Sequence, residues 1–425
     1  MNKKVKNLSI LIIACMSLIS IGANPCKAVI SGIKETSFSF TVKQGHISMP
    51  DGQSILMWGY AIDNGPMQYP GPTLIVNQGD NITITLTNQL PSIYGNVSIV
   101  FPGHEVKATG GVPGLLTNEA PPDGVTSVTY TFTADQPGTY YYHSGTRPEL
   151  QLEMGLIGAI IVRPQGFDPA NPTAYNHPDS AYDREYLFLL SEMDPVIHRL
   201  IEFGTMDEID NTTYRPVYWM INGRAAPDTM FPAKVPWLPH QPYNCMPRMH
   251  PGEKLLMRVI NGGRDLHPFH HHGNHSRIIA KDGRLLKSSP GVGADLAQTV
   301  FTIKSIPGET VDSIFEWTGK GLGWDVYGHK PSDPLAPHEY APDHGKPFPV
   351  KLPDPLNLTY GGFWSGSPFL GSVGDLPPGE GGLNVYGGLF YMWHSHTEKE
   401  MVNNNIFPGG MMTMMVIEPP GAPIP

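Results

Sequence analysis

The sequence predicts an all-β protein assembled from Greek-key β-sandwiches. Glycine (47 residues) and proline (44 residues) are abundant in the 425-residue chain, without the strict period of collagen. Charged residues make up only 16% of the chain, and several short segments alternate apolar and polar residues. No long segment of the sequence shows a helical period. Together these features favour many short strands joined by tight turns.

The N-terminus, residues 1–28, has the form of a secretory signal peptide. Three lysines precede an apolar run from Leu8 to Ile21, and small residues follow it. Cleavage after Ala28 is one expected outcome, and we expect a secreted, periplasmic or cell-envelope protein. A lipoprotein anchored at Cys15 is the lesser alternative, because the apolar run continues past that cysteine.

Charge and cysteine content exclude several classes of function. The net charge is −10 and no Lys/Arg cluster follows the leader, so we expect no nucleic-acid partner. Once residues 1–28 are removed, Cys245 is the single remaining cysteine. An internal disulfide and a cysteine-based zinc or iron–sulfur site are then excluded. A metal site must therefore use His, Asp, Glu or Met.

Two domains are predicted. Domain 1 spans residues 30–165 and a linker rich in Pro, Asn and Asp spans residues 166–183. Domain 2 spans residues 184–425. The expected strands are residues 73–77, 81–87, 127–132, 155–162, 185–190, 254–260, 299–303 and 411–417.

Residues 329–388 interrupt the second strand series. This segment is dominated by Pro, Gly and Asp and shows little strand pattern. It is predicted to be a long loop inserted in domain 2, and loops of this length are either functional or poorly ordered.

The two halves also resemble each other. Residues 72–80 and residues 248–256 each lead into an apolar strand that ends in Asn. Near its end, each half has an aromatic-rich strand followed by a His-Ser pair, at residues 140–144 and 390–396. We interpret this as a duplicated domain.

The strongest chemical signal is the sequence HPFHHHGNH from His267 to His275. Side chains alternate faces along a strand, so His270 and His272 are expected on one face and His271 on the other. By the same argument, His394 and His396 share a face.

Histidines at such spacing indicate a metal site. Two His-x-His pairs in one domain, with His143 at the matching place in domain 1, favour copper or zinc over isolated surface or hydrogen-bonding histidines. His104 is a weaker candidate.

These motifs resemble those of multicopper oxidases, the laccase-like family of cupredoxin proteins, over nearly the whole chain after the leader. Residues 63–66 and 70–74 resemble the opening strands of that family. Three segments resemble its copper motifs: residues 138–144, residues 267–273, and residues 393–396 together with residues 409–411. The resemblance implies two cupredoxin-like Greek-key domains. It points to the short, two-domain branch, whose members commonly form homotrimers.

The resemblance also implies roles for individual residues. His267 matches a ligand of the type 1 copper, through which electrons enter. The matches to ligands of the copper cluster are His143, His270, His272, His394 and His396.

The departures from the family pattern are equally informative. Residues 98–103 lack both histidines of the first motif, and Gly145 replaces a later one. Ser395 stands at the type 1 cysteine and Glu400 at a type 1 histidine. A serine hydroxyl is a hard, weak ligand that stays protonated near neutral pH, so we expect at most a remnant type 1 site of His267, Ser395 and Glu400. Cys245, in a proline-rich turn, is no substitute.

We therefore expect a copper-binding oxidoreductase with fewer ions than a full multicopper oxidase, or a zinc site, formed by three histidines between the domains. Its expected partners are the metal ion and a small-molecule or metal-ion substrate. Catalytic residues are not assigned and enzymatic activity stays open. The alternative is a non-enzymatic cupredoxin scaffold for metal sequestration or for a structural or interaction role at the cell surface.

Two further features are ambiguous. Met411, Met412, Met414 and Met415 suit Cu(I) binding, but their place in an apolar strand favours core packing. Glu398 and Glu400 are either ligands or bases, or solvated charges at a strand end.

Overall fold

The computed structural model describes residues 30–347, 386 and 388–424. The predicted signal peptide lies outside these residues, as do residues 348–385 and 387 of the predicted insertion. Within the described residues the chain is built mainly of strands, which confirms the all-β prediction. The helices in this part of the chain do not combine the length and apolarity needed to cross a bilayer.

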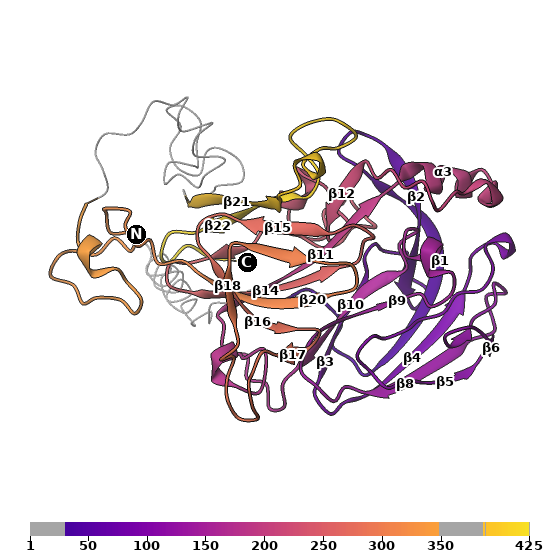
Figure 1. The fold of residues 1–425 in the computed structure, drawn as a ribbon, viewed down its shortest axis with the longest axis horizontal. Helices are drawn as coiled ribbons and strands as arrows, with labels where there is room; N and C mark the ends of the chain where they lie inside the picture. Colours follow the sequence, from indigo (N-terminus) through magenta and orange to yellow (C-terminus); the bar gives the residue numbers. More distant parts are fainter. Residues whose placement is uncertain (1–29, 348–385, 387, 425) are drawn as a thin grey trace, which may run out of the picture.

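The first half of the chain forms two facing sheets, coloured indigo to magenta in Figure 1. The five-stranded sheet has the order β2 (Ser54–Ile62), β1 (Ser37–Ser48), β4 (Asn81–Asn88), β8 (Val128–Thr133) and β5 (Lys107–Gly110). The three-stranded sheet has the order β3 (Gly71–Asn77), β10 (Ile157–Arg163) and β9 (Gly138–His143). A small ribbon joins β6 (Val112–Pro113) and β7 (Asn118–Glu119).

The second half forms a larger pair of sheets. The first has the order β12 (Tyr218–Ile221), β11 (Arg184–Met193), β14 (Lys254–Asn261), β20 (Thr310–Glu316), β16 (Ser276–Lys281) and β17 (Arg284–Leu285), with β18 (Gln298–Val300) beside β16. The second has the order β13 (Arg248–Met249), β22 (Met412–Ile417), β21 (Leu389–Ser395), β15 (His267–His271) and β19 (Thr302–Ser305).

Short helices decorate these sheets. In the described part of the chain the α-helices are α2 (Pro148–Gln151) and α3 (Pro195–Glu202). The 3-10 turns are η1 (Ser92–Tyr94), η2 (Pro178–Ser180), η3 (Met206–Glu208), η4 (Asp228–Met230), η5 (Ala341–Asp343) and η6 (Glu398–Glu400). Helix α3 was not predicted, although Asp194 and Pro195 carry its signal. The Asp194 carboxylate accepts the Val196 N–H, and Pro195 is the first helical residue.

The strand pairings repeat between the two halves. Strand β1 runs parallel to β4, as β11 runs parallel to β14. Strand β3 pairs in parallel with β10, as β13 pairs with β22. The antiparallel pair β9–β10 is likewise repeated by β21–β22. The predicted duplication is therefore visible in the topology, while the domain boundaries stay a prediction.

One expected strand, residues 299–303, is divided in the structure. Residues 298–300 pair with β16 in one sheet, whereas residues 302–305 pair with β15 in the other. The chain changes sheets at Phe301, which is exposed and bends. The alternating pattern that predicted one strand thus belongs to two, and the crossing brings Thr302 beside His270.

Apolar side chains fill the space between the sheets. Strand β4 alternates buried and less buried residues, as expected for a strand with one face on the core. Trp58 and Tyr142 are buried in the first core, and Phe188 and Trp393 in the second. The four methionines 411, 412, 414 and 415 are also buried among apolar residues, which supports core packing over metal binding.

A buried ionic network lies at the junction of the two halves. Arg163 at the end of β10 binds the Glu185 carboxylate with both terminal nitrogens, and the Arg258 Nε donates to the same carboxylate at 3.0 Å. Burial alone would raise the pKa of Glu185, but the two guanidinium groups lower it below its ordinary value. The charges are thus compensated in place.

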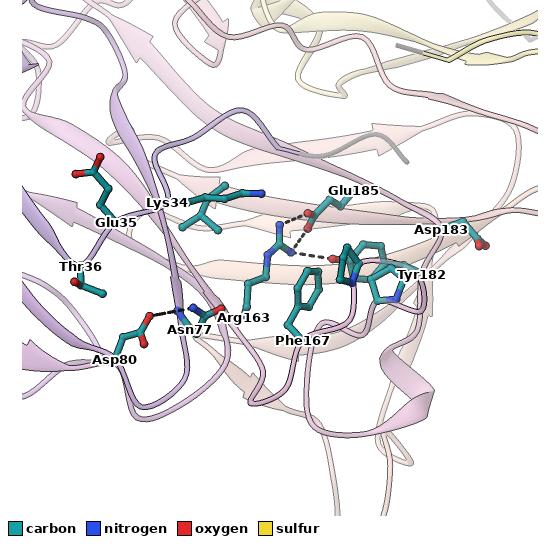
Figure 2. Close-up of a pocket in the computed structure, with 13 residues that line it drawn as sticks. Lys34, Glu35, Thr36, Asn77, Asp80, Arg163, Phe167, Tyr182, Asp183 and Glu185 are labelled. Carbon is teal, nitrogen blue, oxygen red and sulfur yellow. Dashed lines mark hydrogen bonds and ion pairs between the residues drawn. The ribbon is translucent and has the colours of Figure 1, made fainter. Parts of the chain in front are cut away.

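Arg163 also lies in the wall of a cavity of 290 Å³ (Figure 2). In this cavity its guanidinium lies 4.7 Å from the ring centroid of Phe167 and donates to the Tyr182 hydroxyl. Because the guanidinium is already paired with Glu185, the cavity presents no free charge there. None of the predicted metal-binding histidines lines it.

Candidate metal centre

Two of the predicted ligands, His270 and His394, face each other across neighbouring strands. Strands β15 and β21 run antiparallel, and their register pairs His270 directly with His394. Directly paired residues project on the same side of a sheet. The two ring centroids accordingly lie 5.4 Å apart.

His272 joins this pair from the residue after β15. Its Nε2 atom lies 3.4 Å from Nε2 of His394, and its ring centroid lies 4.9 Å from that of His270. One ligand nitrogen from each of the three rings lies within 4.8 Å of the others. The structure thus brings His270, His272 and His394 together on one face, as the alternation predicts.

Hydrogen bonds orient two of these rings. The Nδ1 atom of His394 lies 2.7 Å from its acceptor, the Ser395 carbonyl oxygen. The Nδ1 atom of His270 lies 2.8 Å from the Thr302 hydroxyl. A carbonyl can only accept, so His394 carries its proton on Nδ1 and presents the lone pair of Nε2. Such an outer hydrogen bond is the usual support of a metal-ligating imidazole.

The same two rings are neutral at ordinary pH. Burial is the main cause that lowers the pKa of His270 and of His394 to about 4. Neighbouring imidazoles contribute to the same lowering. Neutral imidazole is the form that binds Cu or Zn, so these residues fit either metal.

His396 lies at the edge of the group. Its ring centroid is 4.9 Å from that of His270 and 5.3 Å from that of His394. Its Nδ1 atom pairs with the exposed Glu398 carboxylate at 2.9 Å. His396 is outside the set whose ligand atoms lie within 4.8 Å of one another.

His143 lies on β9 in the other half of the chain and is not gathered with the three histidines. Its ring stacks on Tyr141, and its Nδ1 atom lies 2.9 Å from the Ser144 carbonyl oxygen. This bond repeats the one between His394 and Ser395. Burial lowers the pKa of His143, which leaves a neutral ring with Nε2 as its acceptor. Within one chain, the three gathered imidazoles therefore come from the second half alone.

The opposite face of β15 holds a different arrangement around His267. Its Nδ1 atom lies 2.8 Å from Oε2 of Glu400, and its Nε2 atom lies 2.7 Å from Oε2 of Glu192. All three side chains are almost fully buried. Burial alone would lower the pKa of His267, but its hydrogen bonds to Glu192 and Glu400 raise it to about 9. We interpret this as a buried imidazolium held by two carboxylates.

Ser395 faces the same side as this ion pair. It pairs with Phe269, which shares a face with His267. The Ser395 hydroxyl is buried and accepts the Thr397 N–H at 3.2 Å. The three residues of the predicted type 1 remnant thus lie on the core face of the sheet. Within this group, Glu400 contacts the Nδ1 atom of His267.

Sequence reasoning missed two residues that shape these sites, Glu192 and Thr302. Both come from strands distant in sequence from the histidine motifs. Glu192 did leave a signal, since it is an acidic residue near the end of the mainly apolar run 187–193. A buried charge in such a run requires a partner. Thr302 left none that separates it from any other strand threonine.

The remaining candidates do not join the metal centre. His104 packs between the rings of Phe132 and Tyr140, at centroid distances of 4.7 and 4.5 Å. His271 lies on the face opposite His270 and His272, as predicted, and is buried there against Phe315 and Trp393.

Cys245 is likewise separate from the histidines. It is buried, and its Sγ atom donates to the Ile221 carbonyl oxygen at 2.9 Å. Burial raises the pKa of its thiol to about 12, so it supplies no thiolate at neutral pH.

Comparisons with known proteins agree with the family resemblance of the sequence. The sequence profile of the multicopper oxidase family matches residues 41–166. Multicopper oxidase VdtB of Byssochlamys spectabilis is 31% identical over 195 residues, which are 44% of this chain and 25% of that protein. Iron transport multicopper oxidase fetC of Epichloe festucae is 32% identical over 228 residues, which are 52% of this chain and 31% of that protein.

Copper resistance protein A of Escherichia coli is 32% identical over 167 residues, which are 39% of this chain and 24% of that protein. In each of these three alignments the chain spans less than a third of the relative's length.

Solved structures share the fold. The blue copper oxidase of Nitrosomonas europaea superposes with a TM-score of 0.55 at 19% identity, covering 90% of this chain and 86% of that one. The multicopper oxidase mgLAC superposes with a TM-score of 0.54 at 18% identity, covering 92% and 88%. Both confirm the cupredoxin-like architecture.

Proposed function

This chain belongs to the multicopper oxidase family, and we propose that it is a secreted copper-binding oxidoreductase whose metal is held by His270, His272 and His394. One observation carries the proposal: three imidazole nitrogens from neighbouring strands converge within 4.8 Å, in a second half built of rigid paired strands. Rings positioned on strands keep their relative geometry better than rings on loops.

We also propose that the protein lacks a type 1 copper. The support is the ion pair of His267 with Glu192 and Glu400, together with the buried hydroxyl of Ser395. Two hard carboxylates and a hydroxyl are a poor donor set for a copper that requires a soft thiolate. Copper bound at the three imidazoles would supply one-electron redox chemistry to a small-molecule or metal-ion substrate. Thr302 and the Ser395 carbonyl hold the imidazoles that bind it.

A homotrimer is part of the proposal. His143 repeats the ring-orienting bond of His394 but lies outside the group in its own chain. We therefore propose that His143 of one copy completes the metal site of the next, with His396 at its edge. Light scattering of the purified protein measures the assembly, and a monomeric mass would contradict it.

The test of the metal site is metal content together with the EPR spectrum of copper-loaded protein. We expect about one bound copper per chain with imidazole nitrogen couplings and no type 1 signal. The double variant His272→Ala/His394→Ala should lose this copper. A matched control is His275→Ala, an exposed histidine of the same motif. Copper retained by the double variant with the EPR spectrum of the wild type would refute the assignment.

Activity is tested separately, by oxygen uptake with phenolic or metal-ion substrates. Turnover that disappears in His272→Ala/His394→Ala but persists in His275→Ala supports the oxidoreductase. The proposed secretion is tested by sequencing the N-terminus of exported protein, which should begin after Ala28.

A second candidate function is a non-enzymatic scaffold that sequesters metal or serves a structural or interaction role at the cell surface. The observation that favours it is the Glu192–His267–Glu400 ion pair, which occupies the place where the family resemblance puts electron entry. Stoichiometric metal binding without substrate-dependent oxygen uptake would select this function.

A further inference from the structure

A second group of metal-binding side chains lies far along the chain from the first, in the segment that follows β20. It consists of Asp325, His329, Glu339 and His344, with one ligand atom from each within 4.8 Å of the others. This segment, residues 317–347, includes the orange loop that projects at the left of Figure 1. Its only described regular element is η5. We propose that these four residues form a structural zinc site.

The distances among the four groups match a tetrahedral ion. Nδ1 of His329 lies 3.3 Å from Glu339 Oε2 and 3.6 Å from Asp325 Oδ2. Nδ1 of His344 lies 2.8 Å from Glu339 Oε1 and 3.7 Å from Asp325 Oδ2. Ligands about 2.05 Å from a tetrahedral zinc lie about 3.3 Å from each other. The group needs only small adjustments to reach that separation.

The charge of the group calls for a divalent cation. The side chains of Asp325 and Glu339 are 1% and 4% exposed. Among the described residues, their ion-pair partners are His329 and His344, with no Arg or Lys. In the form that ligates a metal, with both imidazoles neutral, the two buried carboxylates give the group a charge of −2, and buried charges are either paired or bound to metal. A divalent ion neutralises it.

Hydrogen bonds from outside the group hold each carboxylate. The Oδ1 and Oδ2 atoms of Asp325 accept the N–H groups of Tyr327 and Gly345, both at 2.8 Å. Oε2 of Glu339 accepts the Ala336 N–H at 2.8 Å. These bonds fix the carboxylate oxygens without using all of their lone pairs, as outer partners of metal ligands do.

The two imidazoles are held in the same manner. Nε2 of His344 donates to the Asp333 carbonyl oxygen at 2.9 Å, so in the neutral ring the lone pair of Nδ1 points into the group. The ring of His329 stacks on Tyr327 with a centroid distance of 5.5 Å. Nδ1 of His329 is buried and makes no hydrogen bond. A buried nitrogen directed at two carboxylates without a hydrogen bond has the position of a metal ligand.

Zinc is the metal that this donor set suits best. It accepts mixed imidazole and carboxylate ligands in a closed tetrahedral site. A segment with so little regular structure also gains most from an ion that links its ends, since Asp325 and His344 are 19 positions apart in the chain. The proposed role is therefore to fix residues 325–344 against the second sandwich.

The test uses the full chain, stripped with a chelator and then given zinc alone. Because the three-histidine centre also fits zinc, the measurements start from His272→Ala/His394→Ala. We expect elemental analysis to find about one zinc per chain in this background. Adding Glu339→Gln and His344→Ala should remove it. The matched control is His338→Asn, an exposed histidine of the same segment that pairs with Glu316, and it should keep its zinc.

A second measurement does not depend on the fold of any variant of this cluster. Cobalt(II), added to stripped His272→Ala/His394→Ala protein, should give the strong visible bands of a tetrahedral ion. Zinc should also slow proteolytic cleavage within residues 317–347. The absence of zinc in the starting background, its retention after Glu339→Gln/His344→Ala, or weak octahedral cobalt bands would each overturn the proposal.

Discussion

The Nε2 atom of His267 lies 2.7 Å from Oε2 of Glu192, and both side chains are fully buried. Glu400 approaches the other ring nitrogen at 2.8 Å. The ring is therefore bonded on both sides, and a histidine that the family resemblance assigns to copper is instead engaged by carboxylates. Such a pair is costly to assemble but also costly to break, because each remaining charge would be left buried.

The first prediction concerns stability at alkaline pH. The pKa of His267 is raised to about 9, above its ordinary value of 6.5. The stabilisation is fully present below pH 6.5 and is lost as the pH rises through about 9. Between these values the free energy of unfolding should fall by about 1.4 kcal/mol per pH unit from this group, about 3 kcal/mol in total.

Denaturant unfolding between pH 6 and 10 measures this slope. In His267→Gln the side chain cannot titrate, so the variant should lack the part of the pH-dependent loss of stability that is due to the imidazolium. The titrations of lysines and tyrosines are common to both proteins. Parallel stability curves for the wild type and His267→Gln would contradict a charged His267.

The second prediction concerns Cys245. With a thiol pKa of about 12, its thiolate fraction at pH 8 is on the order of 10⁻⁴. Alkylation by iodoacetamide should be slower than that of an ordinary free thiol by about 10³-fold. Mass spectrometry of the Cys245 peptide follows the reaction, and unfolding in denaturant should restore the ordinary rate. Rapid alkylation of the native protein would show that the cysteine is accessible.

The third prediction rebuilds the missing copper ligands. Ser395→Cys alone should give no blue copper, because Oε2 of Glu400 still lies against Nδ1 of His267. Ser395→Cys/Glu400→His replaces that carboxylate with an imidazole and supplies a thiolate on the same face. The double variant alone should show intense thiolate-to-copper absorption when Cu(II) is added. A colourless double variant, or a blue single variant, would contradict this account of the pocket.

The sequence was informative about the first metal centre because strand alternation is a local property. The spacing of His270 and His272, and of His394 and His396, predicts shared faces, and the register of β15 with β21 brings the nearer members together. Strands were also predictable from two local patterns: alternation, as in β4, and short continuous apolar runs, as in β10 and β22. The division of residues 298–305 between two sheets was not, because it depends on pairing partners distant in sequence.

Glu192 and the zinc ligands show the limit of local patterns. Glu192 reaches His267 from strand β11, 75 residues earlier in the chain, so the contact depends on how the sheets pack. Asp325, His329, Glu339 and His344 lie in a segment without alternation, where spacing predicts no shared face. Their convergence is a property of the folded loop.

The fourth prediction tests the support of the metal centre through Thr302. Its hydroxyl lies 2.8 Å from Nδ1 of His270 and orients that ring. Thr302→Val keeps the shape of the side chain but removes this bond, and outer-shell losses of this kind lower metal affinity by about 10–100-fold. Thr302→Ser retains the hydroxyl and should bind copper nearly as the wild type does. Competition titrations against a chelator of known affinity measure the difference.

Equal affinities for Thr302→Val and the wild type would show that His270 needs no partner, or that it is not a ligand. The ¹H–¹⁵N imidazole signals of the copper-free protein distinguish these two explanations. If His270 is a ligand that needs no partner, its tautomer in Thr302→Val must be the same as in the wild type. If His270 is not a ligand, its tautomer is free to change.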